Sequence, residues 1–116
     1  MKNEIIIFEN QKVKLEVNMK DETVWLTQSQ MSLLFDKAKS TINEHIKNIY
    51  AQKELNESET MRKFGNSEFS NKPTNYYNLD VIISVGYRVN SKQGIIFRKW
   101  ATTILKDYII WKRQLN

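Results

Sequence analysis

The sequence predicts an α+β fold: a small antiparallel sheet at the N-terminus, then a helix-turn-helix with a candidate wing, then two further helices. Apolar and polar residues alternate near the start of the chain, which is typical of half-buried strands. After Leu26 the apolar residues recur every three or four positions, which is typical of helices. The end of the chain carries a broad apolar stripe at helical spacing, which favours a long packed helix.

The length of 116 residues indicates one folded domain, with a sheet region at 1–26, a helix-turn-helix at 27–53, a candidate wing hairpin at 54–78 and C-terminal helices at 79–116. The absence of cysteine excludes disulfides and thiolate sites. No apolar run has the length of a membrane span or of a signal peptide, so we expect a cytoplasmic protein. The net charge of +5 suits an anionic partner, although solvated surface charge is also a common cause.

Each part of the sheet and helix-turn-helix follows from a local pattern. Residues 5–8 and 13–17 predict a hairpin, and residues 24–26 predict a third short strand. Thr27 and Gln30 form a capping box that starts a first helix of about nine residues. A second capping box from Thr41 to Glu44 predicts a second helix that ends near Lys53.

The remaining elements are predicted from turn residues and caps. Residues 59–78 favour a hairpin with Ser70, Asn71 and Lys72 at its tip. Asn78 caps a buried helix, and a last helix is expected from about Ile95 to Leu115. Its predicted stripe contains Ile96, Trp100, Ile104, Tyr108 and Trp111, with Phe97, Ala101, Leu105 and Ile109 beside them.

The second helix is the candidate reader of DNA bases, because such a helix can lie in the major groove while the first helix crosses the backbone. Its inner face is expected to contain Met31, Leu34, Phe35, Ile42 and Ile46. The candidate base-reading residues are Ser40, Thr41, Asn43, Glu44 and Lys47. The same residues are also typical of ordinary caps and solvent-facing positions, and helix pairs of this polarity occur in proteins that bind no DNA.

Basic residues on several elements are the candidate phosphate contacts. They are Lys39, Arg62, Lys63, Lys72, Arg88, Lys92, Arg98 and Lys99. For Arg88 and Arg98 the alternative to a phosphate contact is an internal ion pair with Asp80 or Asp107. For the residues of the predicted wing, the alternative is a plain surface loop. Trp25 and Trp100 are expected in the core.

Catalysis finds little support in the sequence, and we expect a protein that is not an enzyme. His45 is the single histidine, and no known nucleophile, zinc or phosphate-loop motif accompanies it. The acidic residues lack ligand-like spacing, so no metal, no cofactor and no small-molecule substrate is expected. His45 is expected to be packed or to face phosphate.

Three segments of the chain resemble the virulence-associated RhuM family of bacteria. They are VWLTQSQM at 24–31, STINEHIKNI at 40–49 and YYNLDVIISVGYRVNSK at 76–92, of which the last is the most specific. The continuation FRKWATTILKDY at 97–108 is similar to the end of the Bro-N type of DNA-binding domain. Together these resemblances cover nearly the whole chain.

The resemblance implies a DNA-binding module of mobile elements, and it supplies no catalytic residues. We therefore expect sequence-preferring binding of double-stranded DNA by a transcriptional or mobile-element regulator. The alternative is a protein-interaction or adaptor module that docks through the C-terminal helix. Ile109, Ile110 and Trp111 are the candidate contact with a second copy or with a C-terminal region that longer family members contain.

The turn of the helix-turn-helix departs from the family pattern. Where family members tend to have glycine followed by an apolar residue, this chain has Asp36 and Lys37. Aspartate adopts the left-handed conformation less readily than glycine, and a lysine does not suit an inner position. Ala38 is expected to fill that position instead.

Overall fold

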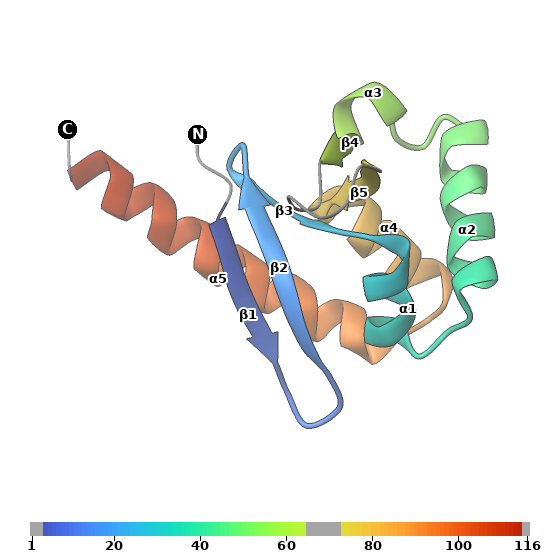
Figure 1. The fold of residues 1–116 in the computed structure, drawn as a ribbon, viewed down its shortest axis with the longest axis horizontal. Coiled ribbons are helices and arrows are strands. Elements are labelled where there is room, and N and C mark those ends of the chain that lie inside the picture. The colour runs from blue at the N-terminus through green and yellow to red at the C-terminus, as the bar shows by residue number, and fades with distance from the viewer. Residues whose placement is uncertain (1–3, 65–72, 115–116) are drawn as a thin grey trace.

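The computed structural model describes residues 4–64 and 73–114, with side chains described as far as Ile110 (Figure 1). The strands are β1 (Glu4–Glu9), β2 (Lys14–Lys20), β3 (Thr23–Leu26), β4 (Met61–Phe64) and β5 (Thr74–Asn78). The helices are α1 (Gln28–Phe35), α2 (Lys39–Ala51), α3 (Glu57–Thr60), α4 (Leu79–Arg88) and α5 (Lys92–Gln114). The α+β class and the order of the predicted strands and long helices are confirmed.

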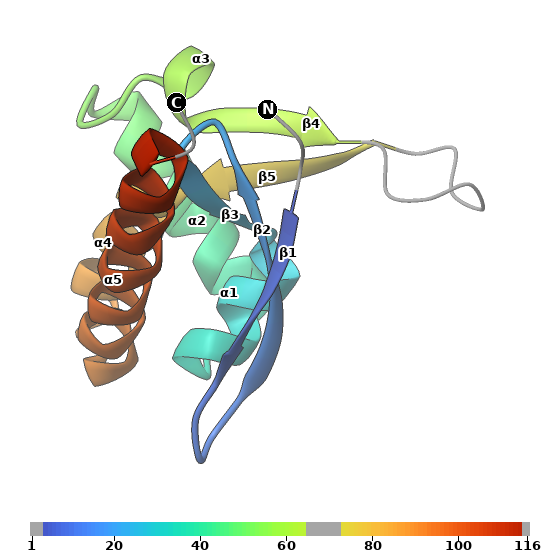
Figure 2. The same cartoon turned by 90° about the vertical axis from the view of Figure 1, so that its left-hand side faces the viewer.

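All five described strands belong to one antiparallel sheet in the order β1-β2-β3-β5-β4. The sequence predicted a separate N-terminal sheet and hairpin, but β3 and β5 pair through Trp25 with Asn78 and Leu26 with Tyr77. The β4–β5 hairpin therefore extends the N-terminal sheet, and Figure 2 shows it projecting to the right, away from α4 and α5. At the other end of the sheet, β1 is an edge strand with Ile5 and Ile7 exposed.

The helices pack on one face of the sheet. Leu15, Val17 and Met19 alternate with polar residues along β2, so one face of that strand is apolar. These three residues share a buried cluster with apolar residues of α1, α2, α4 and α5. The predicted inner-face residues Met31, Leu34, Phe35, Ile42 and Ile46 are all buried in this cluster.

Aromatic rings join α5 to β1. The ring of Phe97, which is fully buried, lies 5.1 Å from the ring of Phe8 and 5.5 Å from that of Trp100 in edge or tilted orientations. Ala101 is buried one turn further on, whereas Ile96 remains 45% exposed. The buried side of α5 is therefore narrower than the predicted stripe.

The first predicted capping box is confirmed and the second is wrong. Thr27 accepts from the backbone of Gln30, and the Gln30 side chain accepts from the backbone of Thr27. By contrast, α2 begins at Lys39, because the extended Ala38 already supplies the first helical acceptor, to the amide of Ile42 at 3.1 Å. Thr41 therefore lies inside the helix, and no side chain caps it.

The turn between α1 and α2 places Ala38 at the surface, and the prediction that it fills an inner position is wrong. Asp36 adopts the left-handed conformation with φ of 53°, a conformation that glycine adopts more readily than aspartate. Ala38 lies outside the core because its extended backbone connects the turn to α2.

Two further helix boundaries differ from the prediction. α5 begins at Lys92 rather than near Ile95, because the Ser91 hydroxyl accepts from the amide of Gln93 at 3.2 Å and starts the helix earlier. The short helix α3 was not predicted, although Asn56 caps it through the amide of Ser58 and such a cap is a recognisable signal. The cap of α4 by Asn78 is confirmed.

Candidate nucleic-acid interface

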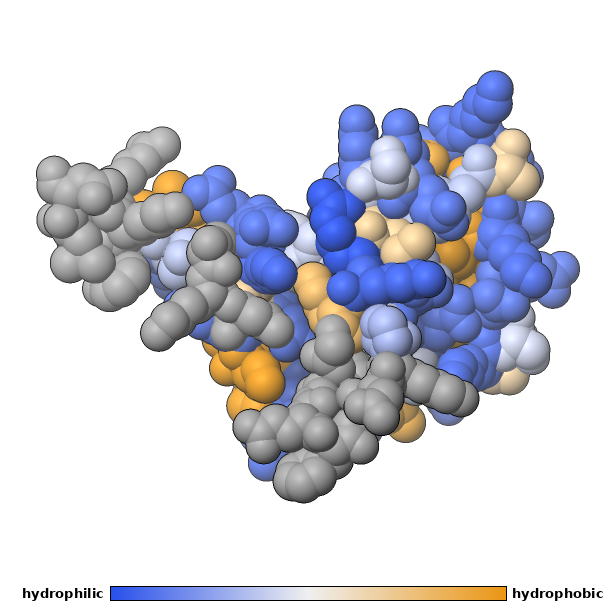
Figure 3. All heavy atoms as spheres, turned by 45° about the horizontal axis from the view of Figure 1, so that its top comes forward, coloured by the Kyte–Doolittle hydropathy of each residue, from blue (hydrophilic) through white to orange (hydrophobic). Residues whose placement is uncertain are grey.

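The start of α1, the start of α2 and the outer part of β5 meet in one shallow recess. Its volume is about 180 Å³, and it is lined by Thr27, Gln28, Ser29, Lys39, Thr74 and Asn75. We call it the α2–hairpin recess. Of the predicted site residues it contains Lys39, and the other lining residues were not predicted. Figure 3 shows mostly hydrophilic residues over the right-hand part of the molecule, where α2 lies.

A short chain of hydrogen bonds lies beside this recess. The amide nitrogen Nε2 of Gln28 donates to Oδ1 of Asn43 at 3.0 Å and to the hydroxyl of Tyr77 at 3.3 Å. Tyr77 is buried, and both amide side chains are half-buried. The orientation of the Asn43 amide is therefore set from α1 and β5, and its Nδ2 group is left as a donor.

The remaining candidate base-reading residues lie along α2. Ser40, Glu44 and Lys47 are exposed at a spacing of three to four residues, so they share one outer face of the helix. Thr41 and Asn43 are half-buried on its flanks. The expected outer position is therefore found for Ser40, Glu44 and Lys47, while Asn43 belongs to the flank that faces Gln28.

The two basic residues of β4 lie on opposite faces of the hairpin. Lys63 is paired with Asn75, which lines the recess, and side chains opposite one another in a sheet share a face. Arg62 is on the other face, where its guanidinium lies 5.8 Å from the centre of the Trp25 ring. Arg62 also donates to the carbonyl oxygens of Ser58 and Met61, at 2.7 and 2.9 Å.

Trp25 is buried, as predicted, but on the sheet face that the helices do not cover. Its ring packs against Phe64 at 5.6 Å, and Phe64 packs against Tyr76 at 4.9 Å. The ammonium group of Lys20 lies 4.8 Å from the Phe64 ring centre. This second aromatic cluster holds Arg62 in a cation–π contact, so Arg62 and Lys63 do not form one phosphate-binding pair.

Arg88 has a protein partner, but neither of the two predicted ones. Its guanidinium nitrogen donates to Glu54 at 2.9 Å and to Gln52 at 3.0 Å, and Ser84 donates to the same Glu54 carboxylate at 2.8 Å. The segment after α2 brings Glu54 next to α4, so the partner found for Arg88 is Glu54, and its role as a phosphate contact stays a prediction. The hydrogen bond from Arg88, and then that from Ser84, lowers the pKa of Glu54.

Replacing Glu54 by glutamine should lower the melting temperature slightly at neutral pH. A carboxylate with a lowered pKa stabilises the fold above its unfolded-state pKa, and this stabilisation is lost as the pH falls through the folded-state pKa. The pair is partly exposed, so its effect should stay within about 1 kcal/mol. Thermal melts from neutral to acidic pH should show the two proteins converging in acid. Glu59→Gln, an exposed carboxylate on α3, is the control, and a pH-independent difference for Glu54→Gln would contradict the assignment.

The other candidate phosphate contacts are not brought to the recess. Lys92 and Arg98 line two other cavities near the α4–α5 turn, and Lys99 is exposed on α5. Lys72 and the rest of the predicted tip, Ser70 and Asn71, lie outside the described residues. At the far end of α5, Ile109 is half-buried and Ile110 is 46% exposed, and the side chain of Trp111 is outside the described part.

His45 is half-buried on α2, and its Nδ1 atom is buried without a hydrogen-bond partner. Within residues 4–64 and 73–114, no three histidine, aspartate or glutamate side chains gather closely enough to hold a metal ion. No helix of the described chain is both long and apolar enough to cross a membrane.

Comparison with known proteins gives one match. A sequence model described as the virulence protein RhuM family matches residues 53–116, which contain α3, the hairpin, α4 and α5. Of the three segments with family resemblance, the third lies inside the match and the first two lie before it. The match gives no support to the resemblance to Bro-N domains, which stays a prediction. Neither the curated proteins nor the solved structures contain a match to this chain.

Proposed function

The chain belongs to the virulence protein RhuM family, and we propose that it is a sequence-preferring double-stranded DNA-binding domain of a transcriptional or mobile-element regulator. In this proposal α1 and α2 act as a helix-turn-helix, and the β4–β5 hairpin acts as a wing. The observation that carries it is the α2–hairpin recess, because there the start of the proposed reading helix and the outer part of the proposed wing line one polar surface.

The proposed contacts divide into those that position the domain and those that read bases. Lys39, at the start of α2, and Lys63, on the recess side of the hairpin, bind phosphates on either side of the groove. Ser40, Glu44 and Lys47 face base edges, and Glu44 accepts from a cytosine amino group there. Asn43 reads an adenine through the amide that Gln28 holds.

Salt-dependent DNA binding is the test of this proposal. Fluorescence anisotropy with a random duplex and with fragments of the protein's own locus, over about 50 to 300 mM salt, should give a steep decrease of affinity with salt. Lys39→Ala should weaken binding to every duplex and lower the salt slope by about one unit. Lys106→Ala, an exposed lysine on α5, should leave both unchanged. Absence of binding at the lowest salt would overturn the proposal.

A second candidate function is favoured by the far end of α5. Ile110 is exposed there, and Figure 1 shows this end of the helix reaching beyond the sheet. In addition, the two basic residues of β4 lie on opposite faces of the hairpin, so they do not bind one phosphate backbone together. In this alternative the chain is an adaptor that docks a second copy or another protein through α5. Self-association that Ile110→Glu abolishes, combined with no DNA binding, would select it.

A further inference from the structure

Large apolar side chains are exposed around the turn between α4 and α5. Tyr87 is 87% exposed, Leu33 62%, Ile95 53% and Ile96 45%. The other strongly exposed apolar residues of the described chain are Ile5 and Ile7 on β1 and Ile110 near the end of α5. Grouped apolar residues at a surface mark interaction sites more often than single ones do.

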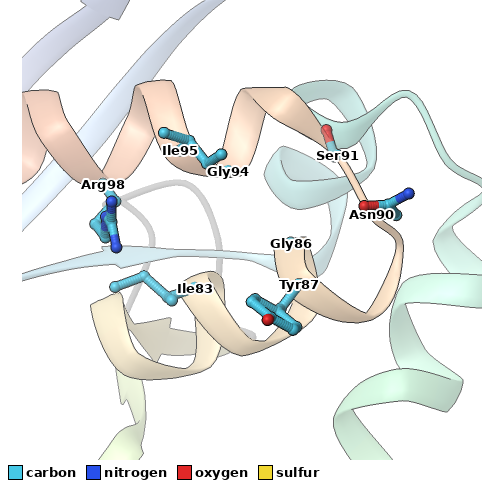
Figure 4. A pocket seen from close by; sticks show the side chains of 8 residues that line it. All are labelled: Ile83, Gly86, Tyr87, Asn90, Ser91, Gly94, Ile95 and Arg98. Carbon is cyan, nitrogen blue, oxygen red and sulfur yellow. The ribbon is translucent and has the colours of Figure 1, made fainter.

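These four residues line two adjoining cavities. The first has a volume of about 370 Å³, and Figure 4 shows Ile83 and Tyr87 of α4 on one side of it and Ile95 and Arg98 of α5 on the other. The second has a volume of about 1190 Å³ and contains Leu33, Ile96, Lys37 and Lys92. Both cavities include Asn90 and Ser91, so they form one continuous surface around the turn, which we call the α4–α5 turn surface.

The floor of the first cavity is closely packed. Gly86 of α4 and Gly94 of α5 approach so closely that a Cβ atom on Gly86 would lie 3.2 Å from Cα of Gly94 and 3.1 Å from the Phe35 ring. Phe35 itself is buried. Because the two helices touch through backbone at this point, the cavity is preformed, and a ligand loses little entropy by ordering it.

The charge around this surface is positive. Lys12, Lys37 and Lys92 line the second cavity and Arg98 lines the first, while Asp36 is the single acidic residue of the two linings. In the described part of the chain the ion pair found is Arg88 with Glu54, and none of these four cations takes part in it. The surface therefore combines apolar anchors with cations that are available to an acidic partner.

We propose that the α4–α5 turn surface docks an acidic segment of another protein that carries apolar anchor residues. Carboxylates of that segment pair with Lys37, Lys92 and Arg98, and its apolar side chains enter the cavities beside Tyr87 and Ile95. Nucleic acid fits less well, since phosphates complement the cations but not the exposed aliphatic groups. A membrane also fits less well, because these residues surround cavities between several elements and do not form the continuous apolar face of one amphipathic helix.

Selection from a displayed library of random peptides tests this proposal without knowledge of the partner. Peptides of about 16 residues, roughly 24 Å long as a helix, are suitable for the library. Selection on the full chain, with excess random duplex present to occupy any DNA-binding surface, should enrich peptides rich in Asp and Glu with aromatic or aliphatic residues between them. Synthetic versions should bind the full chain in solution.

Matched variants locate the binding site. Tyr87→Ala and Ile95→Ala should each weaken the selected peptides about tenfold, as expected for an anchor residue, and Lys92→Glu should weaken them with a loss of salt dependence. Ile7→Ala and Lys14→Glu, two exposed residues on the uncovered sheet face, should not affect binding. The proposal is overturned if no peptide is enriched, if the peptides are neutral or basic, or if the controls weaken binding equally. It is also overturned if Tyr87 and Ile95 instead govern binding to vesicles of phosphatidylcholine and phosphatidylserine.

Discussion

Phe97→Ala should lower the free energy of unfolding by about 3 to 5 kcal/mol, the largest stability effect that we expect from a single substitution in this chain. The Phe97 ring is fully buried and contacts the rings of Phe8 and Trp100, so its removal leaves a cavity between α5 and β1. Urea unfolding followed by tryptophan fluorescence measures the change.

Two further variants keep this result interpretable. A domain of this size has a total stability of about 5 to 15 kcal/mol, so Phe97→Ala can leave part of the protein unfolded. Phe97→Leu keeps most of the apolar volume and should show a smaller loss in the same direction. Ile96→Ala removes a 45% exposed neighbour on the same helix and should change stability far less. Similar losses for Phe97→Ala and Ile96→Ala would contradict the packing described for α5.

Asn43→Ala should reduce discrimination between a preferred duplex and one with a single altered base pair by about ten- to a hundredfold. Its effect on binding to random DNA should be small, because the amide reads a base and bears no charge. Tyr77→Phe should act in the same direction but more weakly. It removes the hydroxyl bonded to Gln28 but leaves the bond from Gln28 to Asn43.

Selection of preferred duplexes followed by competition anisotropy measures this discrimination. Tyr76→Phe is the matched control, because Tyr76 is the chain neighbour of Tyr77 but belongs to the opposite face of the sheet, where it packs against Phe64. Equal losses on preferred and random duplexes for Asn43→Ala would remove its base-reading role. Unchanged discrimination for both Asn43→Ala and Tyr77→Phe would show that the hydrogen bonds joining Tyr77, Gln28 and Asn43 have no part in base recognition.

Local patterns predicted a large part of the fold. The strands 5–8 and 13–17, the cap at Thr27 and the cap at Asn78 depend on residues within a few positions of one another, and all were found. The start of α2 was predicted wrongly. Thr41 and Ala38 are alternative N-cap positions for this helix, and the turn after α1 places Ala38 at the N-cap. That turn depends on the left-handed Asp36, which sequence spacing does not reveal.

Contacts between distant residues escaped prediction for a physical reason. Pairing of β3 with β5 joins residues that are about fifty positions apart, and period-two alternation says nothing about which strands become neighbours. Sequence proximity suggested Asp80 or Asp107 as the partner of Arg88, yet the fold brings Glu54 to it from the segment after α2. Likewise the hydrogen bonds of Gln28 to Asn43 and Tyr77 depend on the packing of α1, α2 and β5, which local spacing does not reveal.

The edge strand β1 bears on how copies of the chain behave at high concentration. Its exposed Ile5 and Ile7 and its unpaired side resemble the templates on which sheets add strands and aggregate. The strand, however, begins with Glu4 and ends with Glu9. Charged residues on an edge strand are one means by which proteins oppose such pairing, because an added strand would have to desolvate the two carboxylates. The two glutamates thus oppose self-association through an edge that the isoleucines would otherwise favour.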